Sequence, residues 1–311
     1  MKALISIAVL GLLAAPVMAA ELPDWAYPVA PPPGPAPDNT AQKSLPGSTK
    51  TYTAAQINDR FGPPDWYTED HPPMPDVVAH GKKPNALACS LCHLTNGAGH
   101  PESAGVSGLP VGYILRQMAE FKSGIRKGMR APIMVQIASA LTDEETKAAA
   151  EYFASQKFPQ FYKVVETDTA PKSYVGAGAM RFATREGGTE PIGNRIIEIP
   201  ADEERTEARD PRANHVAYVP TGSIKKGEII VATGAGGKTV ACTICHGPEL
   251  KGLGEVPPIV GRSPEYIYRQ LNDIKIGTRN GAWTPLMKAV VANLTDEDMV
   301  AISAYLVSKA P

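Results

Sequence analysis

Four apolar residues recur at helical spacing near the end of the chain: Met299, Ile302, Tyr305 and Leu306. Residues at this spacing share one face of a helix, and that face can be buried against the rest of the molecule. The segment before them, Thr295-Asp296-Glu297-Asp298, fits a capping box with the shorter acid at the third helical position. The pattern therefore predicts a helix that begins at Thr295.

Similar patterning predicts further helices in both halves of the chain. Ser263 is suited to cap the start of one of them, and Pro264 to occupy its first helical position. Residues 142–145, Thr-Asp-Glu-Glu, form a complete capping box. The predicted helices run from about Asp76 and about Ser223 into the cysteine motifs that follow, over residues 111–123 and 263–276, and onward from Thr142 and Thr295.

An ungapped internal repeat relates the two sets of helices at an offset of 153 positions. Tyr113-Ile114 recurs as Tyr266-Ile267, and Leu-Thr-Asp-Glu occurs at both 141–144 and 294–297. Further matches at this offset are Arg116-Gln117 with Arg269-Gln270, Gly124 with Gly277, Arg126 with Arg279, and Pro132-Ile133-Met134 with Pro285-Leu286-Met287. The repeat indicates a duplicated domain, so a prediction for one copy supports the other.

Two long segments outside the repeat lack this pattern. Residues 21–75 form a Pro-rich arm, which we expect to be extended or polyproline-like rather than helical. Residues 158–222 link the copies and contain one β-like alternation at 195–199; this linker either wraps the surface or docks a partner. We therefore predict an all-α fold with two domains, 76–157 and 223–311, and with an irregular arm and linker.

The first twenty residues have the features of a secretory signal peptide. Lys2 supplies the positive start, residues 3–15 form the apolar stretch, and residues 17–20 offer small side chains for cleavage. The apolar stretch is too short for a convincing membrane span, although an uncleaved anchor is the alternative. With residues 1–20 removed, we expect a soluble periplasmic protein.

All four cysteines lie in two Cys-x-x-Cys-His motifs, the signature of covalent haem attachment: Cys89, Cys92 and His93, and Cys242, Cys245 and His246. Each motif supplies two thiols for thioether bonds and an imidazole that can reach the iron. A thioredoxin-like redox pair or a zinc site is the alternative. The redox pair lacks its surrounding βαβ pattern, and each zinc site needs additional ligands.

The composition changes this picture little. A net charge of −1 gives no reason to expect nucleic acid or an anionic membrane as a partner. With 30 prolines, 28 glycines and few aromatic residues, the chain predicts short elements and a thin core. A buried haem would supply apolar surface that such a chain lacks.

A haem iron takes a fifth and a sixth ligand, and His93 and His246 are the fifth-ligand candidates. Met134 and Met287 are the sixth-ligand candidates, because each lies 41 positions beyond its histidine at the same place in the repeat. A methionine thioether raises the haem potential. The alternative role for a methionine is core packing. Packing is the interpretation for methionines without a counterpart in the other copy, and His100, which corresponds to Leu253, is expected at the surface.

The combination of motifs resembles the tandem class I cytochromes c. The shared features are Cys-x-x-Cys-His, Tyr-x-x-x-Gln, a Gly-x-Arg loop, the methionine, and the Leu-Thr-Asp-Glu helix start, over residues 76–157 and 223–310. The resemblance implies two small all-α domains, each wrapping one covalently attached haem c. It also implies that the terminal helices pack together and that the thioether edge of the haem lies near the surface.

The two copies depart from each other in one respect. Pro257 follows the family pattern after the haem motif, in which a proline carbonyl accepts a hydrogen bond from the proximal histidine, whereas Ala104 occupies that place in the first copy. The difference predicts two electronically inequivalent haems. Arg126 and Arg279 either contact haem propionates or lie on the solvated surface.

Two irons filled by His and Met favour electron transfer over bond-making chemistry. We therefore expect an electron carrier, not an enzyme, between a dehydrogenase or membrane complex and a terminal acceptor. One alternative is an electron-transfer subunit of a larger periplasmic oxidoreductase, with the arm and linker as docking surfaces. A di-haem peroxidase would need an open iron, and a cysteine-ligated sulfur dehydrogenase would need a fifth cysteine.

Overall fold

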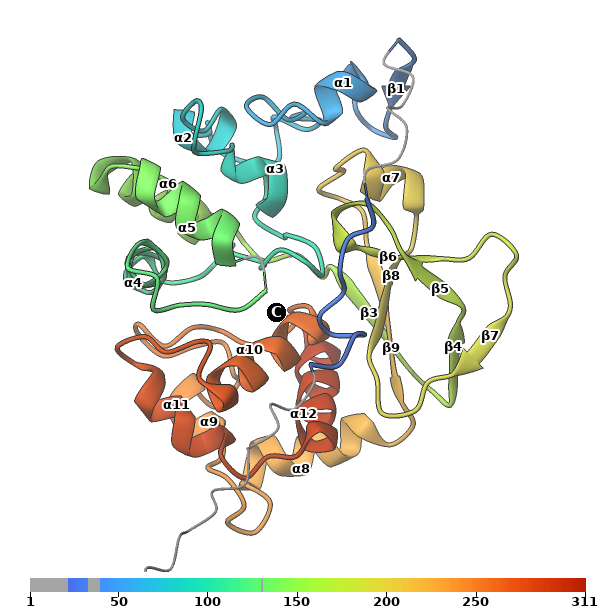
Figure 1. Cartoon of the computed structure of the whole chain (residues 1–311), viewed down its shortest axis with the longest axis vertical. Helices are drawn as coiled ribbons and strands as arrows, with labels where there is room; N and C mark the ends of the chain where they lie inside the picture. Colours follow the sequence, from blue (N-terminus) through green and yellow to red (C-terminus); the bar gives the residue numbers. More distant parts are fainter. Residues whose placement is uncertain (1–21, 33–39, 130) are drawn as a thin grey trace, which may run out of the picture.

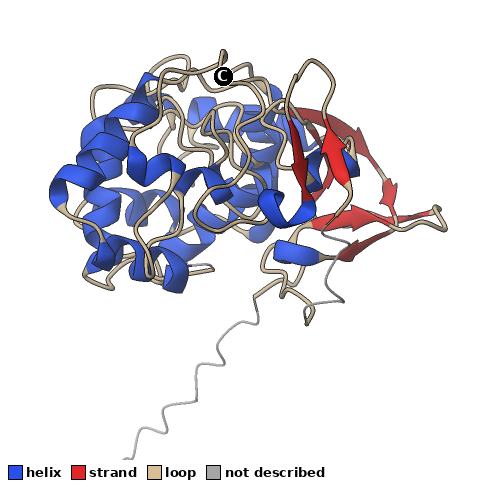
Figure 2. Ribbon diagram, turned by 90° about the horizontal axis from the view of Figure 1, so that it is seen from above, coloured by secondary structure: helices blue, strands red, loops and turns tan. Residues whose placement is uncertain are grey.

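The computed structural model describes residues 22–32, 40–129 and 131–311, so the predicted signal peptide lies outside the described residues. Two groups of helices lie one above the other, and a set of strands stands beside both of them (Figure 1). From above, the strands gather at one side of the molecule and the helices at the other (Figure 2). Among the described residues, no helix is long and apolar enough to cross a membrane.

The first helical group follows the predicted pattern with one break. The elements are α2 (Asp76–Ala79), α3 (Cys89–His93), α4 (Val111–Lys122), α5 (Ala131–Ala140) and α6 (Asp143–Ser155). The capping box at Thr142 is present, with the Thr142 hydroxyl accepting from the Glu145 backbone N–H. The helix from Asp76 ends at Ala79 instead of running into the cysteines. Gly81 adopts a φ of +64°, and a Cβ there would collide with the Ala86 carbonyl.

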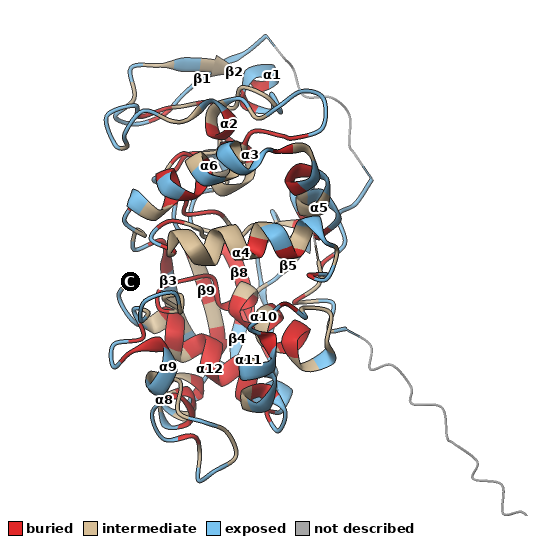
Figure 3. Ribbon diagram, turned by 90° about the vertical axis from the view of Figure 1, so that its left-hand side faces the viewer, coloured by how far each residue is buried: buried red, intermediate tan, exposed pale blue. Residues whose placement is uncertain are grey.

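The second group repeats this arrangement. Its elements are α8 (Ser223–Thr233), α9 (Thr243–His246), α10 (Pro264–Ile276), α11 (Thr284–Val291) and α12 (Asp296–Ser308). Ser263 caps α10 and Thr295 caps α12, as predicted. α8 and α12 pack closely because Gly227 has no side chain where the two backbones meet. α12 carries much of the core, including fully buried Met299 and Leu306 (Figure 3).

The prediction of an all-α fold was wrong, because the linker builds a β structure. β3 (Tyr162–Thr167) pairs in parallel with β9 (His215–Pro220), which pairs antiparallel with β8 (Ile197–Pro200). Two further two-stranded sheets join β4 (Thr169–Pro171) to β7 (Thr189–Pro191) and β5 (Ser173–Val175) to β6 (Arg181–Ala183). A 3₁₀ turn (Ala177–Ala179) and α7 (Glu203–Glu207) complete the linker. The alternation at 195–199 marked strand β8, but its partner β9 is distant in sequence, and strands depend on such neighbours.

The arm is also more ordered than a polyproline segment. Its described part holds a hairpin of β1 (Gln42–Ser44) and β2 (Thr51–Thr53), followed by α1 (Ala54–Ile57). A small core joins the arm to the linker and consists of Leu45, Ile57, Trp66, Tyr67 and Ala208. Trp66 and Tyr67 are almost fully buried there. Their large apolar area therefore anchors the arm, and the sequence pattern had not assigned them a role.

Candidate functional site

The first Cys-x-x-Cys-His motif coincides with helix α3, so one turn presents both thiols and the imidazole. Nδ1 of His93 lies 2.7 Å from the carbonyl oxygen of Ala104. That carbonyl can only accept, so Nδ1 carries the proton and Nε2 keeps a lone pair for a metal. Burial lowers the pKa of His93, which favours the neutral ring that coordinates iron.

The second motif has the same geometry on α9. Nδ1 of His246 lies 2.8 Å from the carbonyl oxygen of Pro257, and burial lowers the pKa of this ring too. Ala104 and Pro257 occupy equivalent places in the repeat. The missing proline therefore does not remove the hydrogen bond, because any residue supplies a backbone carbonyl. The premise that the histidine contacts differ between the two copies was wrong.

The four thiols are present as separate cysteines rather than as disulfides. Burial raises the pKa of Cys89 to about 12 and that of Cys242 to about 11, so both are protonated at neutral pH. Among the described residues, no group of three or more His, Cys, Asp or Glu side chains lies close enough to hold a metal ion. The additional ligands that a zinc site requires are thus missing from the described part of the chain.

The two predicted methionine ligands lie on helices that the sequence did not reveal. Met134 belongs to α5 and packs, half-buried, on the core that also contacts Cys89 and Cys92. Met287 belongs to α11 and packs on the core that contacts Cys242. The fold thus brings each methionine to the core of its own cysteine motif from 41 positions beyond the histidine. Iron ligation by these two side chains stays a prediction.

The residues present fit a covalently attached haem. Each copy offers two reduced thiols, an imidazole whose Nδ1 is held by a carbonyl, and a thioether on the same apolar core. A porphyrin also needs apolar neighbours, and each cysteine motif packs against the apolar core of its own helical group.

Arg126 and Arg279 lie at the contact between the two helical groups, where α4 faces α10 (Figure 3). Arg126 donates to Gln117 of its own copy at 2.6 Å and to Tyr266 of the other copy at 3.2 Å. Arg279 mirrors this, donating to Gln270 and to Tyr113, each at 2.9 Å. The alternative of a solvated surface position was wrong for Arg126, which is 8% exposed. The repeat identified these residues, but only the packing of the copies shows that they join them.

The sequence did not predict a buried cluster of charged side chains. Glu198 of the linker accepts hydrogen bonds from the Ser263 hydroxyl at 2.9 Å and from the Glu265 backbone N–H at 2.6 Å. The Arg269 guanidinium lies 3.7 Å from Glu265 and 3.6 Å from Glu102. All three carboxylates and the arginine are almost fully buried. Little in the sequence indicates this cluster, because Glu198 is a single acidic residue inside an apolar strand.

A family model described as cytochrome c oxidase, cbb3-type, subunit III, matches residues 231–306. A thiosulfate dehydrogenase electron acceptor of Stutzerimonas stutzeri is 29% identical over 231 residues, covering 72% of this chain and 80% of that protein. Cytochrome c4 of Pseudomonas aeruginosa is 26% identical, covering 71% and 83%. Cytochrome c-554(548) of Halomonas halodenitrificans is 33% identical over 73 residues, covering 23% of this chain and 88% of that protein. Among solved structures, a cytochrome c4 of Acidithiobacillus ferrooxidans aligns at 23% identity with a TM-score of 0.48, covering 71% and 98%.

Proposed function

We propose, from the premise that this chain belongs to the c-type cytochrome family and so carries covalently bound haem c, that it is a periplasmic di-haem electron carrier. One haem is assigned to residues 76–157 and the other to residues 223–311. The observation that carries the proposal is the paired site geometry. Each motif has its histidine ring held through Nδ1 by a backbone carbonyl, with a methionine on the same core.

The haem supplies a centre that gains and loses one electron. The polypeptide would hold the haem and would occupy the positions on its iron where other ligands could bind. Cys89, Cys92, Cys242 and Cys245 would bind it, and Nε2 of His93 and of His246 would be available to ligate the iron. Met134 and Met287 would be the second ligands of the two irons and would stabilise the reduced state. A site held in this way would offer no open position to a substrate, which suits electron transfer rather than bond-making chemistry.

An oxidoreductase is the proposed donor or acceptor. The relatives from Stutzerimonas stutzeri and from Thiomonas intermedia are each named a thiosulfate dehydrogenase electron acceptor, which supports an assignment to electron exchange with such an enzyme. The second candidate is a permanent subunit of a larger periplasmic oxidoreductase. The ordered arm and linker favour it, because they add surface beyond what two haem domains need. Co-purification at fixed stoichiometry separates a subunit from a free carrier.

The site assignment is tested with the spectra of the whole holoprotein and its variants. Met134→Ala and Met287→Ala should each open one iron, abolish one methionine–iron absorbance band and allow one carbon monoxide to bind per chain. Met118→Ala is the matched control, because Met118 packs half-buried on the same core as Met134 but has no methionine counterpart in the repeat. It should keep both bands.

Two further results would overturn the proposal. The unmodified protein should contain two haems per chain and should not bind carbon monoxide or peroxide. Ready binding of either ligand would favour the di-haem peroxidase, and a single haem per chain would contradict the assignment of both motifs. The periplasmic location is tested by fractionation of the expressing bacterium, with the expected product lacking residues 1–20.

A further inference from the structure

One arginine, Arg262, ties together the two loops that hold the histidine rings. It lies in the second copy, directly before Ser263, the residue that caps helix α10. Its counterpart in the repeat is Leu109, so the first copy has no equivalent arginine. The contacts of Arg262 are therefore made once in the molecule, although the loops they reach are duplicated.

The two loops correspond residue by residue. The carbonyls that accept from the two histidine rings belong to Ala104 and Pro257, which are counterparts in the repeat. The residues that follow them, Gly105 and Pro258, are counterparts as well. We call Ala104-Gly105 and Pro257-Pro258 the acceptor loops. A planar peptide bond joins the two residues of each loop, so a displacement of the second residue also moves the carbonyl that holds the ring.

The Arg262 guanidinium donates to the second residue of both acceptor loops. Its Nε donates to the Pro258 carbonyl at 3.1 Å, and its Nη1 donates to the Gly105 carbonyl at 2.6 Å. Its Nη2 donates to the Ser107 carbonyl at 3.0 Å, which gives the first loop a second point of attachment. Because the donors of a guanidinium point in fixed directions, this group sets the position of one acceptor loop relative to the other.

The guanidinium is buried and carries its charge into the contact between the copies. Arg262 is 5% exposed and lies over the ring of Phe158, 4.4 Å from the ring centroid. A Cβ at Gly105 would collide with the same ring, so the first loop packs closely there too. Burial lowers the pKa of Arg262 to about 10, which leaves the group positively charged at neutral pH. Its three hydrogen bonds go to neutral carbonyls, so these partners do not cancel the charge.

We propose that Arg262 is a positioning residue for both haem sites, which fixes the acceptor loops relative to each other and raises both reduction potentials through its charge. The inference rests on the proposed function. In the step concerned, one electron from the donor converts a ferric iron to a ferrous iron, and no bond or proton changes place. A nearby positive charge favours the ferrous state, because the ferric iron carries one more positive charge. The hydrogen bond that orients the histidine ring also affects the potential.

The test is a spectroelectrochemical titration of the full-length holoprotein. Arg262→Gln removes the charge and is too short to reach both acceptor loops. It should lower the midpoint potentials of both haems, changing each reduction equilibrium by at least about threefold.

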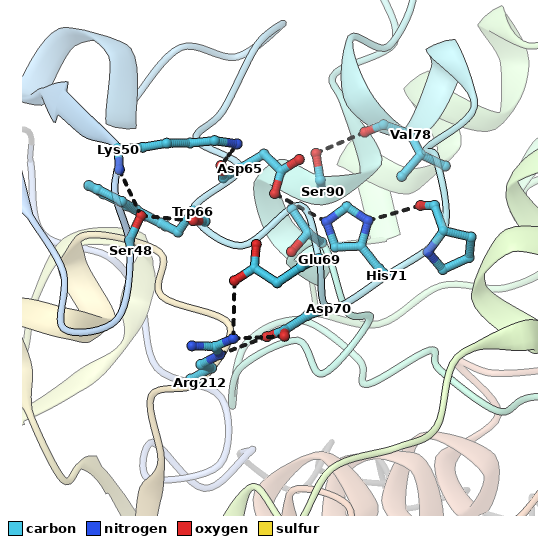
Figure 4. Close-up of polar contacts among 12 residues, drawn as sticks. Ser48, Lys50, Asp65, Trp66, Glu69, Asp70, His71, Val78, Ser90 and Arg212 are labelled. Carbon is cyan, nitrogen blue, oxygen red and sulfur yellow. Dashed lines mark hydrogen bonds and ion pairs between the residues drawn. The ribbon is translucent and has the colours of Figure 1, made fainter.

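Arg212→Gln is the matched control, because Arg212 also joins segments that are distant in sequence. It forms a bidentate pair with Asp70, at 2.6 and 2.7 Å, and lies over the ring of Tyr67 (Figure 4). These partners belong to the arm rather than to an acceptor loop. The charge is also half-exposed and therefore screened, so the control should change each reduction equilibrium by less than about 1.5-fold.

Arg262→Lys separates the charge from the positioning. Lysine keeps the positive charge but ends in one compact ammonium, which lacks the fixed fork of donors. Its two potentials should lie closer to those of the unmodified protein than the potentials of Arg262→Gln do. The hyperfine-shifted haem methyl signals of the ferric protein report the orientation of the histidine rings, and they should change for both haems. Arg212→Lys should leave these signals unchanged.

A shift at one haem only, or equal shifts in Arg262→Gln and Arg212→Gln, would overturn the inference. Unchanged methyl signals in Arg262→Lys would overturn it as well, and this variant decides the matter if Arg262→Gln does not fold. Fewer than two haems per unmodified chain would contradict the proposed function. Two haems per chain with unchanged potentials and signals in the Arg262 variants would instead overturn this inference alone.

Discussion

Raising the pH through neutrality should destabilise the protein through a buried carboxyl group, Glu198. The side chain is 1% exposed and accepts from the Ser263 hydroxyl and the Glu265 backbone N–H. Arg269 lies next to Glu265 and Glu102, and both Arg269 and Arg181 act on Glu265 through their positive charge. Burial raises the pKa of Glu198 from 4.5 to about 7, and burial also raises that of Glu265.

The sign and the size of the effect follow from this shift. Between pH 4.5 and about 7 the folded protein holds a proton on Glu198 that the unfolded chain has released. The contribution to stability is therefore full below pH 4.5 and is lost as the pH rises through 7. A pKa raised from 4.5 to about 7 corresponds to a loss of about 3 kcal/mol in the free energy of unfolding. That is a large part of the stability of a typical domain.

Glu198→Gln isolates this contribution, because its amide oxygen can accept the same two hydrogen bonds without a charge. Urea unfolding followed by tryptophan fluorescence at pH 5 and pH 8 gives the free energy of unfolding of each chain. The variant should gain about 2.5 kcal/mol relative to the unmodified protein between these pH values, because a small part of the difference is already present at pH 5. Glu190→Gln makes the same change at a half-exposed strand position and is the control. An equal pH dependence in the unmodified and Glu198→Gln chains would refute the reasoning.

Three other substitutions give direct checks. Gly227→Ala should cost about 1–3 kcal/mol in urea unfolding, because the new methyl group would collide with the Ala301 carbonyl between α8 and α12. His215 is fully buried, neither ring nitrogen has a hydrogen-bond partner among the described residues, and burial lowers its pKa to about 3. Its contribution is therefore lost as the pH falls from 6.5 towards 3, and His215→Phe should flatten acid unfolding over that range; an unchanged acid limb would contradict this. Arg126→Met should cost about 3 kcal/mol and loosen the contact between the copies, because Tyr266 loses its charged donor; hydrogen exchange near Tyr266 measures the loosening.

Interactions between residues close in sequence explain the parts of the fold that the sequence predicted. A capping box such as Thr142 with Glu145 acts within one turn, so its sequence signature is sufficient to start a helix. No local signal of this kind predicts strand β9. Its two partners, β3 and β8, lie earlier in the chain and are separated from each other by a long segment. The helices that carry Met134 and Met287 were missed for a related reason. They pack against α4 and α10, and helix α11 begins without a side-chain cap.

The sequence by itself determined the chemistry of this protein: two haem-attachment motifs, their histidines, and one methionine candidate for each, all read from a repeat of 153 positions. Only the tertiary structure decided that the two copies are unlike in their surroundings. Arg209 ties the linker to the first motif by a hydrogen bond to the Leu91 carbonyl, and Trp66 ties the arm to the linker by one to the Ala208 carbonyl, each far away in sequence. Such contacts obey no local spacing, since a backbone carbonyl is the same in every residue. A repeat can therefore specify two equivalent sites, while long-range packing gives them different surroundings.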